Sequence, residues 1–393
     1  MIFPVRVAVL TSLYPSEMRP FEGIFAERRW QMMVRRGHSV AVIQPLPYSP
    51  PLLLRGRRAR LRTLPGTSIQ NGICVIRPRY LHVTGLSRWN ARRFAAIGSE
   101  CVAARRHDVA VADYAWPATA AVPLLRGRGI PGVVSARGSD LRIADSTPGL
   151  RKMMAGGLRA SGAWCAVARH LTVELDRIAG CAGHGKLVPN GVDSELFRVR
   201  SRAEARTRLG LPQGGTIVLS VGHLIPRKDP LLALRVFSEA AASLTEPRLV
   251  FVGDGELRRS LLEHADQAGI SRTVSLVGEQ SPMHLAEWYA ACDCLLLCST
   301  WEGRPNVVLE ALASGRPVVA TGTAGSAELL ASFPQMLAEN REPGDIAKLL
   351  VRLVTASPNP ERLRGSVHRY TWEASCRALE ECLALAVEGA DQR

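Results

Sequence analysis

The sequence predicts two doubly wound α/β domains, each built on a mainly parallel sheet. Short apolar segments alternate with segments of helical period along most of the chain, which is typical of parallel strands joined by helical crossovers. The alternation stops in the charged segment Asp193–Gly215 and then restarts, so we expect a hinge there. At 393 residues, the chain is also longer than one hydrophobic core usually serves. We therefore expect domains at 1–200 and 201–370, followed by a C-terminal helix at 371–393 that packs back on the first domain.

Six apolar segments in the first half have the length and composition of strands. They are Val5–Leu10, Ser39–Ile43, Ile73–Arg77, Val109–Ala112, Gly132–Ser135 and Ala163–Val167. Helical periodicity is clear between them in Glu22–Arg36, Arg88–Arg106 and Leu150–Ser161. The segment Pro45–Gly72 does not fit, because four of its first seven residues are proline and Arg55–Arg62 then holds five arginines. A loop of this length is usually functional or mobile.

The second half repeats the pattern of short strands. Its expected strands are Thr216–Val221, Arg248–Val252, Val274–Val277, Cys294–Cys298, Pro317–Ala320 and Gln335–Leu337. Cys292, Cys294 and Cys298 lie close together, but their spacing contains no CxxC pair and leucines flank them. We interpret them as small apolar residues of a buried strand and not as metal ligands. If the two sheets face each other, the carboxyl ends of their strands, where ligands bind, share one cleft.

The balance of charge differs between the two halves of the chain. Residues 1–200 hold 30 Lys and Arg against 12 Asp and Glu, and the remaining residues hold 20 against 23. This asymmetry indicates that the halves meet different partners. No apolar run reaches the roughly 20 residues that span a bilayer, and Met1–Leu10 has the form of a buried strand and not of a signal peptide. We therefore expect a cytoplasmic protein, without a disulfide framework among its nine cysteines.

The most informative segment is Trp301–Ala320, with the sequence WEGRPNVVLEALASGRPVVA. A strand ends just before it, and a turn with Gly and Pro leads into a helix that starts near Asn306. The backbone N–H groups of Asn306 and Val307, together with the helix dipole, suit pyrophosphate or sugar oxygens. Glu302 on the turn suits a place near a sugar ring, and Glu310, one turn into the helix, suits the hydroxyls of a ribose. The alternative is that Glu302 caps the helix and Glu310 is a solvated surface residue.

With these motifs the chain resembles the retaining glycosyltransferases of family 4, which have the GT-B fold of two Rossmann-like domains facing across a cleft. Glu302 and Glu310 match the paired-glutamate motif of that family. The motif Gly-x-Pro-Asn-Val-x-Leu-Glu is similar to the motif of one branch of the family. That branch contains bacterial surface-polysaccharide enzymes, including teichuronic acid biosynthesis transferases. Further segments resemble family motifs in the same order along the chain: Tyr14–Phe25, Val188–Asp193, Ser220–Asp229 and Val252–Glu256.

The resemblance implies donor-binding roles for particular residues. It makes Lys228 the lysine that binds the donor phosphates, and the guanidinium of neighbouring Arg227 suits two phosphate oxygens at once. It places Gly222 beside them, Asp254 near the nucleoside, and Gly23 where the backbone approaches the donor phosphates. The alternatives are that Arg227 and Lys228 form a solvated loop pair and that Gly23 is a plain turn glycine.

Two positions depart from the family pattern. Family members often carry Gly-Arg where this chain has Gly222 and His223, so one phosphate-binding cation is either missing or supplied by Arg227. Many also carry His-Gly-x-Asp where this chain has Arg137-Gly-Ser-Asp140. A permanently charged Arg137 cannot act as a base, so we expect it to bind a phosphate of donor or acceptor, with Asp140 orienting it. The alternative for both residues is a buried salt bridge at a strand end.

The reaction that the resemblance implies is sugar transfer with retention of configuration. The donor would be a nucleotide sugar, of the UDP or GDP type, and the acceptor a glycan, glycolipid or lipid-linked cell-surface polysaccharide. We assign the catalytic roles to Lys228, Arg227 and Glu302, with positive charge stabilising the departing nucleoside diphosphate. The nucleotide sugar is a substrate, so we expect no cofactor. The sequence contains no Asp-x-Asp motif, so we expect activity without a metal ion.

Other functions fit the sequence less well. A nicotinamide-dependent oxidoreductase would carry Gly-x-Gly-x-x-Gly after its first strand, where this chain has Thr11-Ser-Leu-Tyr-Pro. A nucleic-acid-binding protein would share the basic first half, but no recognition motif is present and aromatic residues make up only 5% of the chain. A sugar-nucleotide epimerase with the GT-B architecture stays open as an alternative, because it would use the same donor without an acceptor.

The basic first half leads to one further expectation, which is docking on the anionic inner surface of the cell membrane. Lysines and arginines near such a surface are attracted to it, and Arg55–Arg62 lies beside the apolar Leu52–Leu54. The resembled family often uses polyprenyl-linked acceptors, which are held at membranes. The alternative is that the arginines reflect a GC-rich coding bias and form a solvated basic face.

Overall fold

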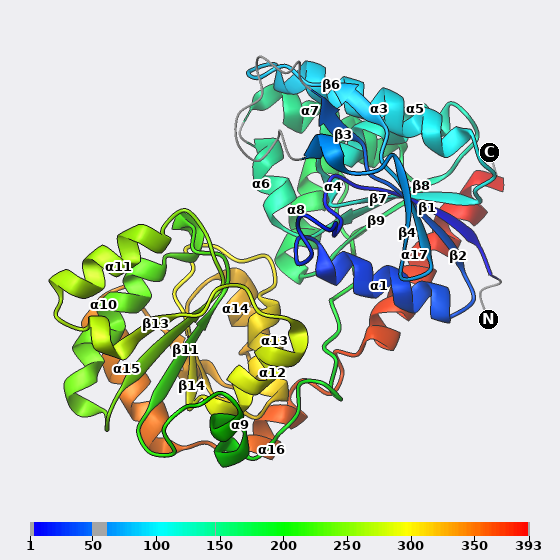
Figure 1. Cartoon of the computed structure of the whole chain (residues 1–393). Coiled ribbons are helices and arrows are strands. Elements are labelled where there is room, and N and C mark those ends of the chain that lie inside the picture. The colour runs from blue at the N-terminus through cyan, green and yellow to red at the C-terminus, as the bar shows by residue number, and fades with distance from the viewer. Residues whose placement is uncertain (1–3, 49–60, 146, 392–393) are drawn as a thin grey trace. The chain divides into compact units, whose positions relative to one another are not determined.

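The computed structural model describes residues 4–48, 61–145 and 147–391. The chain divides into two compact units, Met1–Gly191 with Trp372–Arg393, and Val192–Thr371. Each unit has its own sheet and hydrophobic core (Figure 1). Within the described ranges, no helix has both the length and the apolar character that a membrane span needs.

The first unit contains an eight-stranded sheet in the order β10-β9-β8-β7-β1-β2-β5-β4. All its neighbouring pairs are parallel except β4 with β5. The strands are β1 (Arg6–Leu10), β2 (Ser39–Ile43), β4 (Thr67–Gln70), β5 (Ile73–Ile76), β7 (Val109–Asp113), β8 (Gly132–Ala136), β9 (Ala163–Ala166) and β10 (Lys186–Leu187). A separate parallel pair, β3 (Leu46–Tyr48) and β6 (Arg79–Leu81), follows the ends of β2 and β5.

Helices cover both faces of this sheet. On one face, Val7 and Val9 of β1 share a core with α1 (Ile24–Arg35) and with α17 (Trp372–Asp391), the red helix of Figure 1. On the other face, Leu10 contacts Gly98 of α3 (Ser87–Ala103), as the alternation of side chains along a strand requires. The other helices among the described residues of this unit are η2 (Leu61–Thr63), α4 (Ala115–Ala118), η3 (Thr119–Ala121), α5 (Val122–Arg126), α6 (Ser139–Asp145), α7 (Pro148–Ala160) and α8 (Arg169–Ala179).

The second unit contains a six-stranded, wholly parallel sheet in the order β13-β12-β11-β14-β15-β16. Its strands are β11 (Ile217–Val221), β12 (Arg248–Val252), β13 (Val274–Leu276), β14 (Cys294–Leu297), β15 (Val318–Thr321) and β16 (Leu337–Ala338). Helices α10 (Pro230–Ala240) and α15 (Pro343–Ala356) pack together on one face, and α12 (Pro282–Ala291) and α13 (Asn306–Ala313) cover the other (Figure 1). The other helices are α9 (Arg202–Arg208), η4 (Pro226–Lys228), η5 (Ala241–Ser243), α11 (Arg258–Gln267), η6 (Ser271–Thr273), α14 (Ala324–Leu329), η7 (Pro334–Met336) and α16 (Pro360–Gly365).

The predicted fold class is confirmed, and three segments differ from the expected elements. Asp193–Gly215 is not a simple hinge, because it lies in the second unit and contains α9, whose Arg206 is buried and forms an ion pair with Asp293 at 2.8 Å. The segment Pro45–Gly72 contributes β3, η2 and β4, while its residues 49–60 lie outside the described residues. The strand expected at Gln335–Leu337 is mostly the 3-10 helix η7, and β16 begins only at Leu337.

The clustered cysteines are buried apolar residues of the second core, as the sequence predicts. Cys292, Cys294 and Cys298 lie at or beside β14, and burial raises the pKa of Cys292 and of Cys298 to about 12. All nine cysteines of the chain are free thiols. Within the described part of the chain, no three His, Cys, Asp or Glu side chains group in a way that could hold a metal ion.

Candidate active site

The second sheet has one topological switch point, between β11 and β14. From β11 the chain continues outward through β12 and β13, and from β14 it continues to the other edge through β15 and β16. In sheets of this type, ligands bind beyond the carboxyl ends of the strands that flank the switch point. Lys228 lies in η4 after β11, and Glu302 lies in the turn after β14. Two residues that are 74 positions apart are therefore brought to the same edge of the sheet.

Lys228 and Glu302 form an ion pair at this point. The Lys228 Nζ lies 2.5 Å from Glu302 Oε1, which also accepts a hydrogen bond of 2.6 Å from the hydroxyl of Ser299. The Arg227 guanidinium is 3.6 Å from the other carboxylate oxygen, Oε2. Glu302 is only 4% exposed, and 17% of the Lys228 side chain remains accessible. The site thus contains a buried carboxylate with two cations, both partly open to solvent.

The turn after Glu302 leads into helix α13, which begins at Asn306, where the sequence predicts it. Pro305 occupies the N-cap position, and no side chain caps this helix start. Glu302 therefore does not serve as the N-cap. Because the N-terminus of a helix carries partial positive charge on its N–H groups, the first turn at Asn306 and Val307 is suited to oxygens of an anionic ligand.

Glu310 lies one turn into α13 and is buried, with 4% exposure. The hydroxyl of Tyr289 on α12 donates a hydrogen bond of 3.1 Å to Glu310 Oε2. Burial, together with the nearby Glu310 charge, raises the pKa of Tyr289 well above its ordinary value, so the tyrosine remains a donor. Glu310 is thus held by a neutral hydroxyl and is not the solvated surface residue of the alternative interpretation.

Glycines bring the ends of β11 and β12 close together beside this pair. Gly222 has a φ of 146° and Gly253 a φ of 137°, a range that favours glycine. A Cβ on Gly253 would lie 2.1 Å from the Gly222 carbonyl oxygen, so no side chain fits there. Asp254 follows at the end of β12; it is exposed, and its Oδ1 accepts a 2.8 Å hydrogen bond from the Gly255 N–H. Gly222, Lys228 and Asp254 therefore lie at the same edge of the sheet as Glu302.

In the first unit, Gly23 immediately precedes α1, in the loop after β1. Its φ of 82° is left-handed, and an added Cβ would lie 3.0 Å from the Leu13 carbonyl oxygen. No side chain caps this helix start either. The local backbone alone therefore explains why glycine occupies this position, and a role in approaching a phosphate remains a prediction.

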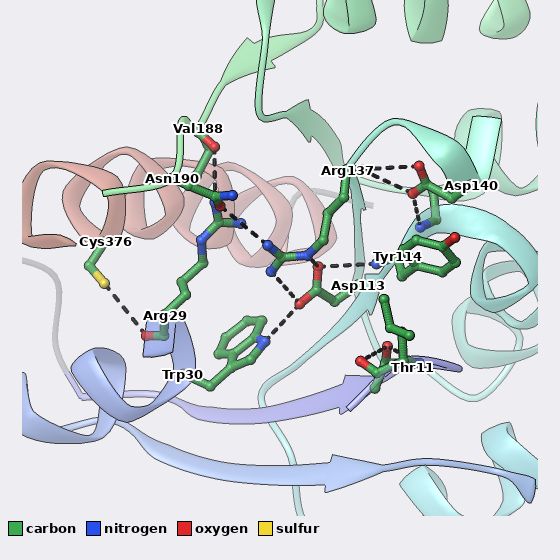
Figure 2. A network of polar contacts seen from close by, with 12 residues as sticks. Thr11, Arg29, Trp30, Asp113, Tyr114, Arg137, Asp140, Val188, Asn190 and Cys376 are labelled. Carbon is green, nitrogen blue, oxygen red and sulfur yellow. Dashed lines mark hydrogen bonds and ion pairs between the residues drawn. The ribbon is translucent and has the colours of Figure 1, made fainter. Parts of the chain in front are cut away.

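Arg137 lies at the end of β8 in a buried polar cluster (Figure 2). Its Nε and Nη2 donate to the two carboxylate oxygens of Asp113 at 2.9 and 2.8 Å, and its Nη1 donates to Asn190 Oδ1 at 3.3 Å. Arg29 of α1 donates to the same Asn190 oxygen at 2.9 Å, and Trp30 donates to Asp113 at 2.8 Å. The guanidinium of Arg137 thus has a counter-ion within its own unit, as the salt-bridge alternative expects.

Burial acts on the two charged partners of this cluster in opposite ways. It would raise the pKa of Asp113, but the charge and hydrogen bonds of Arg137, the charge of Arg29 and the Trp30 hydrogen bond outweigh it, so that pKa lies below its ordinary value. Burial, reinforced by the charge of Arg137, lowers the pKa of Arg29 to about 10. Both groups are therefore charged near neutral pH.

Asp140 does not orient the Arg137 guanidinium, which corrects the sequence-based expectation. Its carboxylate accepts hydrogen bonds from backbone N–H groups, including 2.6 Å bonds from Ala115 and Gly138 and a 3.1 Å bond from Arg137. Burial nevertheless raises its pKa above the ordinary value. Asp140 therefore stabilises the loop backbone at the start of α6, and Asp113 is the residue that orients Arg137.

Sequence reasoning missed several residues that contact the predicted ones. Asp113 could have been found, because it is a carboxylate directly after the buried run Val109–Ala112 and thus at a strand end. Tyr289 lies on a helix 21 residues before Glu310, and Arg29 lies 161 residues before Asn190. No local pattern identifies such partners.

Comparisons with known proteins show which family and fold the chain resembles. Residues 201–367 match the protein family described as "Glycosyl transferases group 1". The chain is 29% identical over 360 residues to TuaC of Bacillus subtilis, a glycosyltransferase assigned to teichuronic acid biosynthesis, and the match covers 88% of this chain and 89% of that protein.

Solved structures show the same architecture over nearly the whole chain. Sucrose-phosphate synthase from Thermosynechococcus elongatus matches with a TM-score of 0.77 at 18% identity, over 96% of this chain and 98% of that chain. HepE from Anabaena, solved in complex with UDP, matches with a TM-score of 0.73 at 16% identity, over 97% and 99%. Identities this low establish the fold alone. The chain therefore has the GT-B fold, and its residues 201–367 match the group 1 glycosyl transferases.

Proposed function

We propose that the protein is a retaining glycosyltransferase of family 4 that transfers a sugar from a UDP- or GDP-sugar to a lipid-linked surface glycan. One observation carries the proposal most directly. At the switch point of the second sheet, the Lys228–Glu302 pair lies beside the uncapped start of α13, with buried Glu310 one turn further on. This arrangement offers positive charge to a diphosphate. It also offers carboxylates to the hydroxyls of the sugar and of the ribose, which flank the diphosphate in a nucleotide sugar.

In the proposed reaction, Lys228 and the first turn of α13 bind the donor diphosphate and stabilise the charge that grows as it departs. The bond between the sugar C1 and the phosphate oxygen breaks, and a bond from C1 to the acceptor oxygen forms on the same face. The acceptor proton passes to the departing phosphate oxygen, so no side chain of the protein has to act as a base. This suits the presence of Arg137 at this position, because a guanidinium does not act as a base.

The proposal gives further roles to the other residues that the sequence singles out. Glu302 faces the sugar ring, Arg227 supports the charge of the phosphates, and Glu310 accepts hydrogen bonds from the ribose. Gly222 and Asp254 line the nucleotide side. In the first unit, Gly23 approaches the donor, while Arg137 acts on a phosphate of donor or acceptor. The reaction needs neither a cofactor nor a metal ion, because these cations and the helix start supply the positive charge.

Two relatives support the choice of donor and acceptor. HepE, whose fold this chain shares, was solved with UDP and with UDP-glucose. TuaC is assigned to the biosynthesis of teichuronic acid. By extension, we propose that the acceptor of this chain is an anionic or lipid-linked glycan at the cytoplasmic face of the membrane.

A surface of the first unit supports contact with that membrane. Residues 28–99 contain 14 arginines, of which Arg29 and Arg77 are buried, and no lysine, aspartate or glutamate. Leu81 at the end of β6 is exposed and pairs in register with exposed Tyr48, and Val83 and Leu86 are exposed on the segment that joins β6 to α3. Three exposed arginines follow on the first two turns of α3: Arg88, Arg92 and Arg93. Apolar side chains bordered by arginines suit an anionic lipid surface. Binding of nucleic acid would use the arginines but would not require the exposed leucines.

The direct test is a screen for release of nucleoside diphosphate from UDP-, GDP- and ADP-sugars, with membrane extract as the source of acceptor. We expect one donor class to be consumed, and the product to keep the anomeric configuration of the donor sugar when analysed by NMR. An inverted product would refute the retaining mechanism. Conversion of the donor into an epimeric nucleotide sugar, without any acceptor, would establish the epimerase alternative instead.

A further inference from the structure

Arg304 has an unusual environment for a charged residue. It lies in the turn between Glu302 and α13, and its side chain is only 1% exposed. One guanidinium nitrogen, Nη1, donates to Glu328 of α14 at 3.2 Å, while Nε and Nη2 make no hydrogen bond within the described residues. Buried polar atoms without partners are costly and call for an explanation. Packing alone does not explain the buried guanidinium, because an apolar side chain of similar volume would fill the same space without unpaired polar atoms.

The turn that carries Arg304 packs tightly against α14. A Cβ on Gly325 of that helix would lie 2.6 Å from the Gly303 carbonyl oxygen and 2.8 Å from that of Glu302. The ion pair between Arg304 and Glu328 is the second contact with the same helix. Movement of Arg304 therefore moves the segment that sets both the Glu302 carboxylate and the start of α13.

On its other side, Arg304 stacks on an aromatic ring. Its guanidinium carbon lies 4.4 Å from the centroid of Tyr370, a separation typical of cation–π contacts. Tyr370 precedes by two residues the point where the chain passes from the second unit back to the first, at Thr371 and Trp372. Its carbonyl oxygen accepts a 2.8 Å hydrogen bond from the N–H of Val192, the residue at which the second unit begins. Tyr370 thus joins both segments that connect the units.

We propose that Arg304 is a positioning residue that couples the turn between Glu302 and α13 to Tyr370, and through it to both connecting segments. The guanidinium is held by an ion pair at one end and by the ring at the other. Its position therefore sets where Glu302 and the first turn of α13 lie when the donor reacts. The kinetic part of this inference rests on the proposed function.

A double-mutant cycle tests the coupling. Arg304→Met and Tyr370→Ala should each lower kcat for nucleoside diphosphate release about tenfold, with a smaller change in the donor KM. Tyr370→Phe keeps the ring and should stay close to wild type. The variant with both Arg304→Met and Tyr370→Ala should be no slower than the slower single variant, because both remove the same contact. The matched control is Arg362→Met, since Arg362 makes another cation–aromatic contact in this unit, 5.7 Å from Phe333.

Amide hydrogen exchange gives a second readout that needs no activity. Tyr370→Ala should speed exchange at the N–H groups of residues 302–308, and Tyr370→Phe and Arg362→Met should not. Unchanged exchange in Tyr370→Ala, or additive losses of kcat in the double variant, would overturn the coupling. If wild type released no nucleoside diphosphate from any donor, the proposed function would fail, and the exchange result would still decide the role of Arg304.

Discussion

The ammonium group of Lys228 lies 2.5 Å from Glu302 Oε1. The carboxylate is nearly inaccessible, while the lysine keeps part of its side chain in contact with solvent. A phosphate that binds Lys228 therefore meets a cation that Glu302 already holds in place. Removing one member of such a pair leaves the other buried without its main counter-charge.

Lys228→Met should lower both turnover and stability. The loss of the cation removes stabilisation of the departing phosphate, and it leaves Glu302 with Ser299 and a guanidinium at 3.6 Å. We expect a stability loss of about 3 kcal/mol, the lower end of values for a broken buried pair. Combining Lys228→Met with Glu302→Gln should recover much of the stability but none of the turnover. Thermal unfolding and nucleoside diphosphate release measure the two effects, and a double variant that regains activity would show that the pair is only structural.

Glu310→Gln should weaken donor binding. A neutral amide has one acceptor oxygen where the carboxylate has two, and it lacks the negative charge, so its two polar atoms cannot each accept from a ribose hydroxyl. The loss of a charge-assisted hydrogen bond costs about 1.5–3 kcal/mol, which is roughly a ten- to hundredfold change in the dissociation constant. Calorimetric titration with the nucleoside diphosphate measures it. Tyr289→Phe is the control for orientation alone and should have a smaller effect, whereas unchanged affinity in Glu310→Gln would exclude Glu310 from the site.

Asp113→Asn should destabilise the first unit in a pH-dependent manner. The folded-state pKa of Asp113 lies below its ordinary value of 3.8, so its ionised form contributes stability above that pH and loses it as the pH falls through the folded pKa. At pH 7 we expect a loss of about 3–5 kcal/mol, because Arg137 and Arg29 lose their shared counter-charge. Denaturant unfolding of both proteins at pH 7 and near pH 3 should show the difference shrinking in acid. A difference that grows in acid would contradict the assignment.

Much of this site could be predicted from the sequence, because its signals are local. The Gly-Pro turn after an apolar strand sets the start of α13 at Asn306, and parallel strands bring Lys228 and Glu302 to the same edge of the sheet. That the two residues pair depends on β11 and β14 being neighbours. The partner of Arg137 could not be predicted in the same way. Asp140, three residues away, appeared to be the natural counter-ion, but its carboxylate is taken by backbone N–H groups of the loop. The actual partner, Asp113, comes from a neighbouring strand, and that contact depends on strand order.

A chelator should leave the activity unchanged. In the proposed site the positive charge comes from Lys228, Arg227 and the first turn of α13, and the sequence has no Asp-x-Asp motif to bind a metal–diphosphate complex. Nucleoside diphosphate release measured with and without EDTA provides the test. Loss of activity in EDTA that magnesium or manganese restores would refute the expectation and indicate a metal ion that enters with the donor.

Docking on anionic membranes should depend on the exposed surface between β6 and α3. Each arginine near an anionic bilayer contributes about 1 kcal/mol, screened within a Debye length, so Arg88, Arg92 and Arg93 replaced together by glutamine should weaken vesicle binding more than tenfold. Replacing Leu81, Val83 and Leu86 by serine should also weaken it, through loss of inserted apolar area. Sedimentation with phosphatidylglycerol vesicles, compared with phosphatidylcholine vesicles and with high salt, measures the effect.

The controls for docking come from the second unit and from the arginine-rich loop. Leu262 and Met283 are exposed apolar residues of the second unit, and serine there should not change vesicle binding. The five arginines of Arg55–Arg62 lie in a segment that is largely outside the described residues, and glutamine at all five tests whether that loop adds to the same attraction. Binding that ignores lipid charge and salt, or that survives both sets of arginine replacements, contradicts electrostatic docking. If the protein bound nucleic acid but not vesicles, the arginine-rich surface would belong to a different partner. In that case the variants with serine at Leu81, Val83 and Leu86 would bind nucleic acid as wild type does.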